Sequence, residues 1–333
     1  MKQFTIDNID YDMSSIRGLI KTEEALSEHT TWKVGGRAKI YFQPDDVNDL
    51  QQFLKKLENE QHQILWLGLG SNVLIRDKGF NGIVINTVGR LKQINFFESD
   101  KKHKTSDKYG KLMVSAESGV SCAKFSREVA AAGFTGAEFF SGIPGSMGGA
   151  IAMNAGAFGG ECWRNLEYVE TIDESGNIKT RNKNEFNISY RQVKGLQTTD
   201  KGNSEWYIKG FFSYPQSYIQ GSDLENIKIA ESKAKIKALL AERNLKQPVQ
   251  YANAGSVFRN PEGDYAARLI ERCGLKNQQI GNAVVSEKHA NFIINKGGAK
   301  ASDIEALIEM IQQQVYNKFS ITLQPEVHIY GER

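Results

Sequence analysis

Two glycine-rich segments contain residues that could hold a phosphate or a flat ligand. The first, Gly68-Leu69-Gly70-Ser71-Asn72, follows the apolar run 64–67, which predicts a buried strand ending in a turn. Glycines let backbone amides come close to a phosphate, and serine and asparagine side chains can add hydrogen bonds. The Rossmann fingerprint needs glycine where Val73 stands, and no P-loop Gly-Lys-Ser/Thr sequence is present. A pyrophosphate-binding turn and an ordinary strand-to-loop turn both remain open for this segment.

The second glycine-rich segment runs from Ser141 to Ala150 and continues into Asn154-Ala155-Gly156-Ala157. Glycine loses more backbone entropy on folding than any other residue, so a dense group of glycines is costly in an ordered segment. The cost is easier to explain if a bulky planar or phosphate-bearing ligand presses against the backbone. We therefore favour a ligand role over a purely structural loop. Two separated loops of this kind could clasp one extended dinucleotide.

Three polar residues in short motifs are candidates for catalysis. Arg191 follows Tyr190, Ser256 lies within the run from Asn253 to Pro261, and Glu326 lies in Gln324-Pro325-Glu326-Val327. Each has an ordinary interpretation as well: a surface arginine, a turn residue and a solvated carboxylate. From the residues alone, we favour these ordinary interpretations.

The segment Thr31-Trp32-Lys33-Val34-Gly35-Gly36 and the two glycine loops together resemble the FAD-binding domain of the vanillyl-alcohol-oxidase type. Within that superfamily, the chain resembles the UDP-N-acetylenolpyruvoylglucosamine reductases from about Thr30 to Gly331. The resemblance implies noncovalent FAD, and the loops contain no histidine or cysteine that would suggest a covalent link. The FAD-binding residues that it implies are Gly68, Leu69, Gly70, Ser71, Asn72, Gly142, Pro144, Gly145, Ser146, Gly149 and Ala155.

The same resemblance implies catalytic roles for the three polar residues. NADPH would reduce the flavin, which would pass a hydride to the enolpyruvyl ether of a UDP-sugar and leave an enolate-like charge. Arg191 is suited to that charge because it stays protonated and can bind a carboxylate in a bidentate manner. Glu326 could donate a hydrogen bond only if burial raises its pKa. Ser256 would supply the final proton to the carbon, which works because the enolate is strongly basic.

The family's shorter subfamily, which this chain resembles, implies that Tyr190 and Arg243 hold the UDP-sugar. Two positions depart from the pattern. His328 stands where some relatives have arginine, so any substrate contact there would be weaker or would require a protonated ring. Val193 replaces a frequent serine, which we expect to affect loop packing alone. We treat His289 as a structural histidine.

Two other classes of function remain open at this stage. The chain could be a sugar or alcohol oxidase on the same FAD scaffold, although Ser256 and Glu326 argue against it because an oxidase needs no proton donor to a carbanion. It could also be a non-catalytic flavin- or nucleotide-binding module, in which the three polar residues would coincide by accident.

Hydrophobic periodicity predicts the elements that must position these residues. Helical spacing predicts helices over 45–57 and 121–133, with Ser121 capping the second. A basic-faced helix is expected from 224 to about 243, bounded by Gln247-Pro248. A capping box beginning at Ser302 predicts a fourth helix with an apolar stripe over 304–315. Strands are expected at 64–67 and 83–85, and a β-hairpin at 169–187 with its turn at 174–177. The polar stretch 98–111 predicts an exposed loop or hairpin tip.

Strands and helices alternate irregularly, which favours an α+β (mixed α/β) fold. By resemblance we expect a two-part FAD-binding domain, with subdomains at 1–88 and 89–218, and a substrate-binding domain at 219–325. The tail 326–333 would return to the first subdomain. A change in composition near residues 215–222 marks the expected start of the C-terminal domain.

Composition limits the remaining possibilities. The net charge is +3 with both signs interspersed, which gives no electrostatic case for nucleic acid. The three cysteines, Cys122, Cys162 and Cys273, are odd in number and widely spaced, so they fit neither a disulfide framework nor a zinc site. We find no signal-peptide core and no apolar run of membrane-spanning length. We expect a cytoplasmic enzyme that needs no metal, membrane or obligate protein partner.

Overall fold

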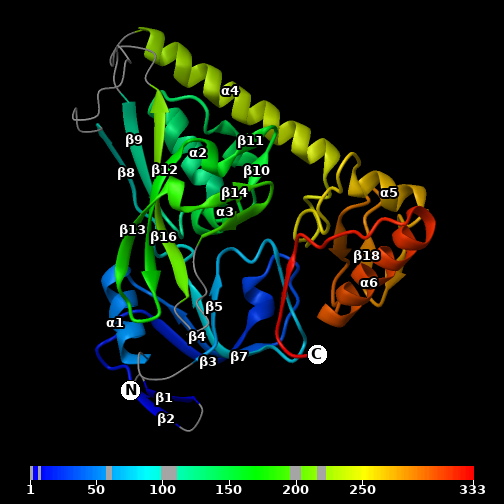
Figure 1. Cartoon of the computed structure of the whole chain (residues 1–333), viewed down its shortest axis with the longest axis horizontal. Helices are drawn as coiled ribbons and strands as arrows, with labels where there is room; N and C mark the ends of the chain where they lie inside the picture. The colour runs from blue at the N-terminus through cyan, green and yellow to red at the C-terminus, as the bar shows by residue number, and fades with distance from the viewer. Residues whose placement is uncertain (1–2, 7–8, 58–61, 99–110, 196–203, 216–222) are drawn as a thin grey trace.

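The computed structural model describes residues 3–6, 9–57, 62–98, 111–195, 204–215 and 223–333, and it has the mixed helix and strand content expected of an α+β fold. The chain forms two neighbouring sheets with helices packed on them, a long connecting helix, and a separate C-terminal lobe (Figure 1). Among the described helices, none combines the length and apolar character that a membrane span requires.

The first sheet has the strand order β3-β4-β7-β5, in which β4, β7 and β5 run parallel and β3 antiparallel. Its strands are β3 (Leu19–Ala25), β4 (Arg37–Gln43), β7 (Phe80–Asn86) and β5 (Ile64–Leu67). Helix α1 (Val47–Leu57) buries its apolar face on this sheet, where Phe53 stacks on Phe42 at 3.8 Å between ring centroids. The predicted helix is confirmed, and Asp46 accepts a hydrogen bond from the amide of Asp49 in its first turn.

The second sheet is antiparallel, with the order β13-β12-β16-β9-β8. Its strands are β13 (Ile178–Asn182), β12 (Leu166–Asp173), β16 (Glu205–Pro215), β9 (Lys111–Glu117) and β8 (Ile94–Glu98). The predicted hairpin is confirmed, because β12 and β13 pair in an antiparallel manner. In the turn, Asp173 accepts hydrogen bonds from the amides of Ser175 and Asn177. The expected loop between β8 and β9 lies at 99–110, outside the described residues.

Two helices cover one face of the second sheet and present the second glycine loop. Helix α2 (Cys122–Ala131) begins as predicted, with the hydroxyl of Ser121 accepting from the amide of Lys124 at 3.2 Å. Helix α3 (Met147–Ala152) follows the loop, and Met147 and Ile151 are fully buried. Cys122 and Cys162 are buried free thiols, and Cys273 is a partly buried free thiol.

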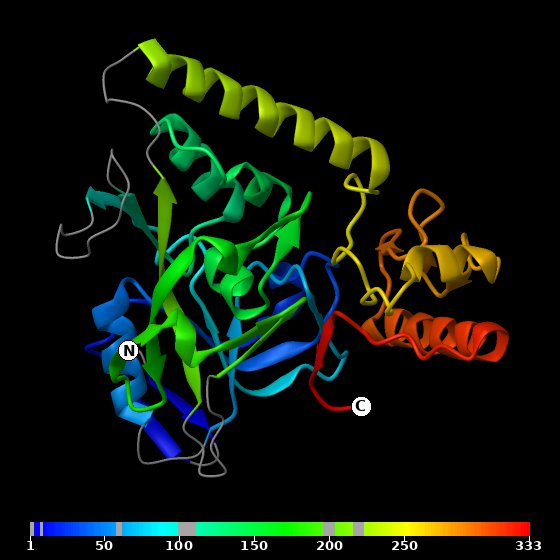
Figure 2. The same cartoon turned by 45° about the horizontal axis from the view of Figure 1, so that its top comes forward.

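Helix α4 (Asp223–Lys246) is 24 residues long and runs over α2 towards the C-terminal lobe (Figure 2). It is fastened near its middle, where the hydroxyl of Ser232 donates to Glu138 at 3.0 Å and Lys235 pairs with the same carboxylate at 3.2 Å. The predicted helix is therefore confirmed and ends just before Pro248. The composition change expected at 215–222 lies almost entirely in residues outside the described part.

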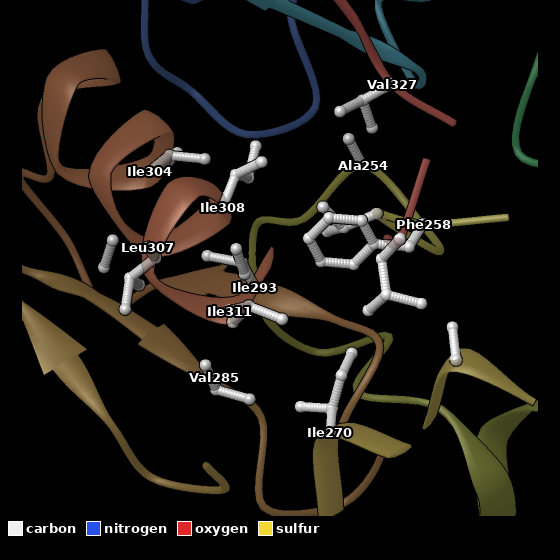
Figure 3. Close-up of a cluster of buried hydrophobic side chains, with 14 of the residues drawn as sticks. Ala254, Phe258, Ile270, Val285, Ile293, Ile304, Leu307, Ile308, Ile311 and Val327 are labelled. Atoms are coloured by element: carbon white, nitrogen blue, oxygen red, sulfur yellow. The ribbon is translucent and has the colours of Figure 1, made fainter. Parts of the chain in front are cut away.

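The hydrophobic core of the C-terminal lobe, which Figure 3 shows in close-up, also takes in Trp32, Val34 and Leu74 from the N-terminal part of the chain. Helix α6 (Ala301–Phe319) packs its apolar stripe, including Ile304, Leu307 and Ile311, against a small sheet and α5 (Ala266–Arg272). The sheet strands are β17 (Gln279–Ile280), β18 (Ala283–Val285) and β19 (Ile293–Asn295). Phe258 and Val327 are buried in the same core, so the segments that carry them are fixed to this lobe.

The predicted capping box beginning at Ser302 is wrong. Helix α6 begins at Ala301, so Ser302 already lies within its first turn. The carboxylate of Asp77 accepts hydrogen bonds from the amides of Ala301 at 2.8 Å and Ser302 at 3.0 Å, and Asp303 accepts from the amide of Lys300 at 2.9 Å. A cap supplied by a distant segment leaves no signature in the local sequence. The sequence around Ser302 therefore predicted the wrong capping residue.

Arg76 and Asp77 form what we call the clamp between the first sheet and the C-terminal lobe. Arg76 binds Glu305 of α6 through Nε at 2.9 Å and Nη2 at 2.8 Å, and its Nη1 donates to the carbonyl of Gly331 at 2.7 Å. Nearby, the indole of Trp32 donates to the carbonyl of Ile293 at 2.7 Å. Strand β20 (His328–Tyr330) then pairs in parallel with β6 (Val73–Ile75), which follows the first glycine loop. The end of the chain is thereby brought to that loop.

The remaining elements are short. They are β1 (Gln3–Ile6), β2 (Ile9–Asp12), η1 (Leu26–His29), η2 (Glu138–Gly142), β10 (Gly156–Ala157), β11 (Gly160–Glu161), η3 (Cys162–Arg164), η4 (Lys183–Glu185), β14 (Asn187–Ser189) and β15 (Gln192–Lys194).

Candidate active site

A cavity of about 590 Å³ lies where the two glycine loops, the β14–β15 turn, the end of α4 and the C-terminal lobe meet. It is lined by all of the residues that were predicted to bind FAD, and by four predicted catalytic or substrate-binding residues: Arg191, Arg243, Ser256 and Glu326. These residues are as much as 258 positions apart in the sequence, from Gly68 to Glu326. The fold therefore brings together the whole predicted set except Tyr190, which is 50% exposed and is not among the described residues that line the cavity.

The glycines of the two loops fall into two groups. A Cβ atom on Gly145 or Gly149 would come no closer than 3.6 Å to another atom, so these positions are open towards the cavity. A Cβ on Gly148 would lie 2.8 Å from Cβ of Ser118, and one on Gly70, which has φ +67°, would lie 2.1 Å from the carbonyl oxygen of His29. Gly148 and Gly70 are thus required by the fold itself, while Gly145 and Gly149 leave space for a ligand.

Ser146 and Asn72, both predicted to bind FAD, also have structural partners. The hydroxyl of Ser146 caps α3 by accepting from the amide of Gly149 at 3.4 Å. The side-chain amide of Asn72 donates to the carbonyl of Glu326 at 3.0 Å, and the carbonyl of Asn72 accepts from the amide of His328 at 3.0 Å. Asn72 therefore joins the first glycine loop directly to the segment that carries Glu326, a contact that the sequence motif did not reveal.

Arg191 and Glu326 form an ion pair at the cavity wall, with Nε of the arginine 3.1 Å from Oε1 of the glutamate. Arg191 lies at the tip of the β14–β15 hairpin with φ +55°, a left-handed conformation that non-glycine residues rarely adopt. It is held there by this ion pair and by a hydrogen bond from Nη2 to the carbonyl of Gly156 at 2.7 Å. Backbone strain kept in place by such contacts is typical of functional sites.

Burial raises the pKa of Glu326, and the charges of Arg191 and Arg259 oppose that rise. The side chain of Glu326 is 13% exposed, so the burial that the sequence interpretation required is present. A carboxyl group with a raised pKa can be protonated at a higher pH than an ordinary glutamate, and it can then donate a hydrogen bond.

Ser256 is placed beside Glu326 by a short antiparallel contact between their segments. The amide of Glu326 donates to the carbonyl of Val257 at 2.7 Å, and Phe258 forms a bridge with Pro325. Asn291 fixes the other side of this segment, since its amide group donates to the carbonyl of Phe258 at 2.8 Å. Within the described part of the chain, the Ser256 hydroxyl makes no hydrogen bond, so it is available to a ligand.

Arg243 enters the cavity from the last turn of α4. Burial lowers its pKa, and its described polar contact is Gln247, whose Oε1 accepts from Nε at 3.1 Å. A partly buried arginine that has no carboxylate partner among the described residues is suited to bind an anion. Gln247 and Phe158 also line the cavity, and the sequence interpretation gave neither a role.

Comparisons with known proteins show which class of protein this chain resembles. Residues 38–181 match the family model described as "FAD binding domain", and residues 247–330 match "UDP-N-acetylenolpyruvoylglucosamine reductase, C-terminal domain". The fold and the glycine-lined cavity therefore define an FAD-containing oxidoreductase.

The more specific assignment comes from full-length relatives. The chain is 47% identical to the UDP-N-acetylenolpyruvoylglucosamine reductase of Coxiella burnetii over 96% of this chain and 98% of that protein. It is 46% identical to the enzyme of the same name from Legionella pneumophila, over 95% and 94%. The crystal structure of the Thermus caldophilus enzyme superposes with a TM-score of 0.72 at 26% identity, over 95% of this chain and 99% of that one.

The chain belongs to the UDP-N-acetylenolpyruvoylglucosamine reductase family. The predicted fold class, FAD cofactor and reductase activity on a UDP-sugar in peptidoglycan synthesis are confirmed, and the oxidase and non-catalytic alternatives are set aside.

Proposed function

We propose that Arg191, Ser256 and Glu326 perform the protein's part in the NADPH-dependent reduction of UDP-N-acetylglucosamine enolpyruvate to UDP-N-acetylmuramate. The observation that supports this assignment is the partly buried Arg191–Glu326 ion pair at 3.1 Å, on the wall of a cavity shared with Ser256 and the two glycine loops. A surface arginine and a solvated glutamate would not be buried against each other beside open glycines.

The residues present fit FAD. The open positions at Gly145 and Gly149 leave a cradle that a Cβ would fill, and the residues of the first loop, including Ser71, line the same cavity. When bound, FAD supplies the redox centre through which a hydride passes from NADPH to the substrate. The chain's own contribution is to bind, orient and neutralise the groups around that transfer.

Arg191 is proposed to bind the carboxylate of the enolpyruvyl group. In the structure its side chain is 20% exposed and its guanidinium is paired with one carboxylate, that of Glu326. An incoming carboxylate would compete for the same guanidinium, whose planar shape allows bidentate binding. As negative charge develops on this group during reduction, a fixed cation stabilises the transition state by about 3–4 kcal/mol.

Ser256 is proposed to donate the proton that completes the reduction, and Glu326 to donate a hydrogen bond to the developing enolate. The serine hydroxyl is free of other hydrogen bonds in the described structure, and the raised pKa of Glu326 favours its protonated form. A serine is a weak acid, so it must be held close to a strongly basic carbon. The backbone contact between the two segments provides that fixed position.

Arg243 and Tyr190 are proposed to bind the UDP part of the substrate. Arg243 offers a partly buried positive charge to a pyrophosphate, and the exposed ring of Tyr190 lies 5.3 Å from the guanidinium carbon of Arg191. We also propose the domain division 1–88, 89–218 and 219–325, and a cytoplasmic location, which suits three free cysteines.

The test is identification of the product after incubation of the purified protein with NADPH and the UDP-enolpyruvyl sugar. We expect UDP-N-acetylmuramate from the native chain and a large loss of rate in Arg191→Gln, Ser256→Ala and Glu326→Gln. Normal product formation at an undiminished rate by any of these variants would contradict the role given to that residue.

A further inference from the structure

Arg259 is a partly buried arginine whose charge the assigned roles do not use. Its Nε atom is buried and has no hydrogen-bond partner among the described residues. The described part of the chain also contains no carboxylate within ion-pair distance of its guanidinium. It is not one of the described residues that line the cavity, so it does not meet a ligand there directly. A desolvated cation without a partner is costly unless its charge acts on a neighbour.

The neighbour is Glu326, and the backbone determines the arrangement. The amide of Arg259 donates to the carbonyl of Gln324 at 2.9 Å, and the Phe258–Pro325 bridge sets the register between the two segments. In this register Arg259 and Glu326 are diagonal neighbours on one face, at a spacing of about 7–8 Å that long side chains can bridge. Phe258 belongs to the other face and is buried in the core of the C-terminal lobe, as Figure 3 shows.

The charges of two arginines, Arg191 and Arg259, act on the carboxyl group of Glu326. Glu326 faces Arg191 from the β14–β15 turn and Arg259 from its own wall, and His328 is the other titratable group on which Arg259 acts. In the absence of substrate, two arginines face one glutamate. When a substrate carboxylate takes Arg191, as proposed above, Glu326 loses its ion-pair partner and gains a negative neighbour. Arg259 is then the cation that remains beside Glu326.

We propose that Arg259 is a positioning residue that acts through Glu326: from behind the cavity wall it holds the carboxyl group in place after Arg191 has turned to the substrate. The proposal rests on the proposed function of Glu326. It also implies that the two arginines have different roles: Arg191 binds the substrate carboxylate, and Arg259 positions Glu326.

The test measures reoxidation of the pre-reduced flavin by the UDP-enolpyruvyl substrate as a function of pH in the native enzyme, Arg259→Gln and Arg259→Lys. Without the Arg259 charge, protonation of Glu326 becomes easier, so the inflection due to Glu326 moves upward by about one pH unit. On the low-pH side of the inflection, where Glu326 is protonated in both proteins, we expect a roughly tenfold lower rate in Arg259→Gln, because the carboxyl group has lost the residue that positions it. The Lys variant keeps the charge and keeps the inflection near its native position.

Three controls separate the possible causes. Arg268→Gln removes an exposed arginine of α5, which pairs with Asp264 just before that helix. This change should leave the pH profile unchanged. The upward shift should persist in a His328→Gln background, which excludes His328 as the titrating group. Reduction of the flavin by NADPH, measured separately, should be the same in Arg259→Gln and in the native enzyme.

The outcomes distinguish this proposal from the proposed function. If the inflection remains in Glu326→Gln, the glutamate does not titrate in the reaction and its assigned role fails. If the inflection disappears in Glu326→Gln but does not move in Arg259→Gln, the role of Arg259 alone is overturned. A lower rate in Arg259→Gln with an unmoved inflection and no recovery in Arg259→Lys would make the arginine a purely structural residue.

Discussion

Gly149→Val is expected to remove FAD without unfolding the protein. The position lies in α3 and is exposed to the cavity, and a Cβ there would come no closer than 3.6 Å to the hydroxyl of Ser146. The fold therefore has room for the valine, and valine has a slightly better helix propensity than glycine, by a few tenths of a kcal/mol. The stability of the protein without FAD should be unchanged or slightly higher.

The cost of Gly149→Val falls on the ligand. The added methyl groups project into the cavity of about 590 Å³ that the two glycine loops share. Overpacking a well-filled site typically costs about 1–3 kcal/mol, which corresponds to about 5- to 150-fold weaker FAD binding. The flavin-to-protein ratio of the purified variant and a titration with FAD measure this loss.

Gly148→Ala is the matched control for Gly149→Val. Its methyl group would meet Cβ of Ser118 at 2.8 Å, away from the open side of the loop, so it should lower the thermal stability of the protein even in the absence of FAD. Full flavin stoichiometry and unchanged FAD affinity in Gly149→Val would refute the placement of FAD against this loop.

Three further results are expected. Ser256→Ala should slow flavin reoxidation by the substrate by about 10²- to 10⁴-fold and leave reduction by NADPH unchanged, with partial recovery in Ser256→Cys; equal slowing of both steps would make the serine structural. Arg191→Lys should lower kcat far more than it raises KM, because a point charge replaces a planar bidentate donor; an unchanged kcat would move the residue from catalysis to binding. Asp77→Ala should destabilise the protein by about 1 kcal/mol in thermal unfolding, because α6 loses its cap. Burial raises the pKa of Asp77, but hydrogen bonds from Ser302 and Ala301 outweigh it and lower the pKa. Its contribution should therefore be complete above the ordinary aspartate range and fall as the pH drops through the lowered value; a native-like unfolding curve in Asp77→Ala at neutral pH would contradict this role.

Local patterns in the sequence predicted local structure well. Apolar spacing located α1, α2 and the stripe of α6, because each of these helices buries one face whatever its neighbours are. The cap of α6 was missed because its hydrogen-bond acceptor, Asp77, is more than 220 residues away in the sequence.

The candidate site could be predicted as a set of residues but not as a geometry. Motif resemblance brought together Arg191, Ser256 and Glu326, yet the 3.1 Å ion pair and the positive φ of Arg191 depend on how the β14–β15 turn meets the end of the chain. The second task of Asn72 and the charge of Arg259 behind Glu326 depend on the same distant contacts. The spacing of these residues in the sequence does not predict the contact between the β14–β15 turn and the end of the chain.

The clamp has a consequence for the design of inhibitors. Because Arg76 and Asp77 tie α6 to the first sheet and β20 extends β6, the wall that carries Ser256 and Glu326 is a fixed template. The opposite wall is different, since Arg191 stands on a two-stranded hairpin tip and Arg243 on the last turn of α4. A rigid compound shaped to the template would keep its contacts, and adaptable anionic groups belong on the side that faces the two arginines.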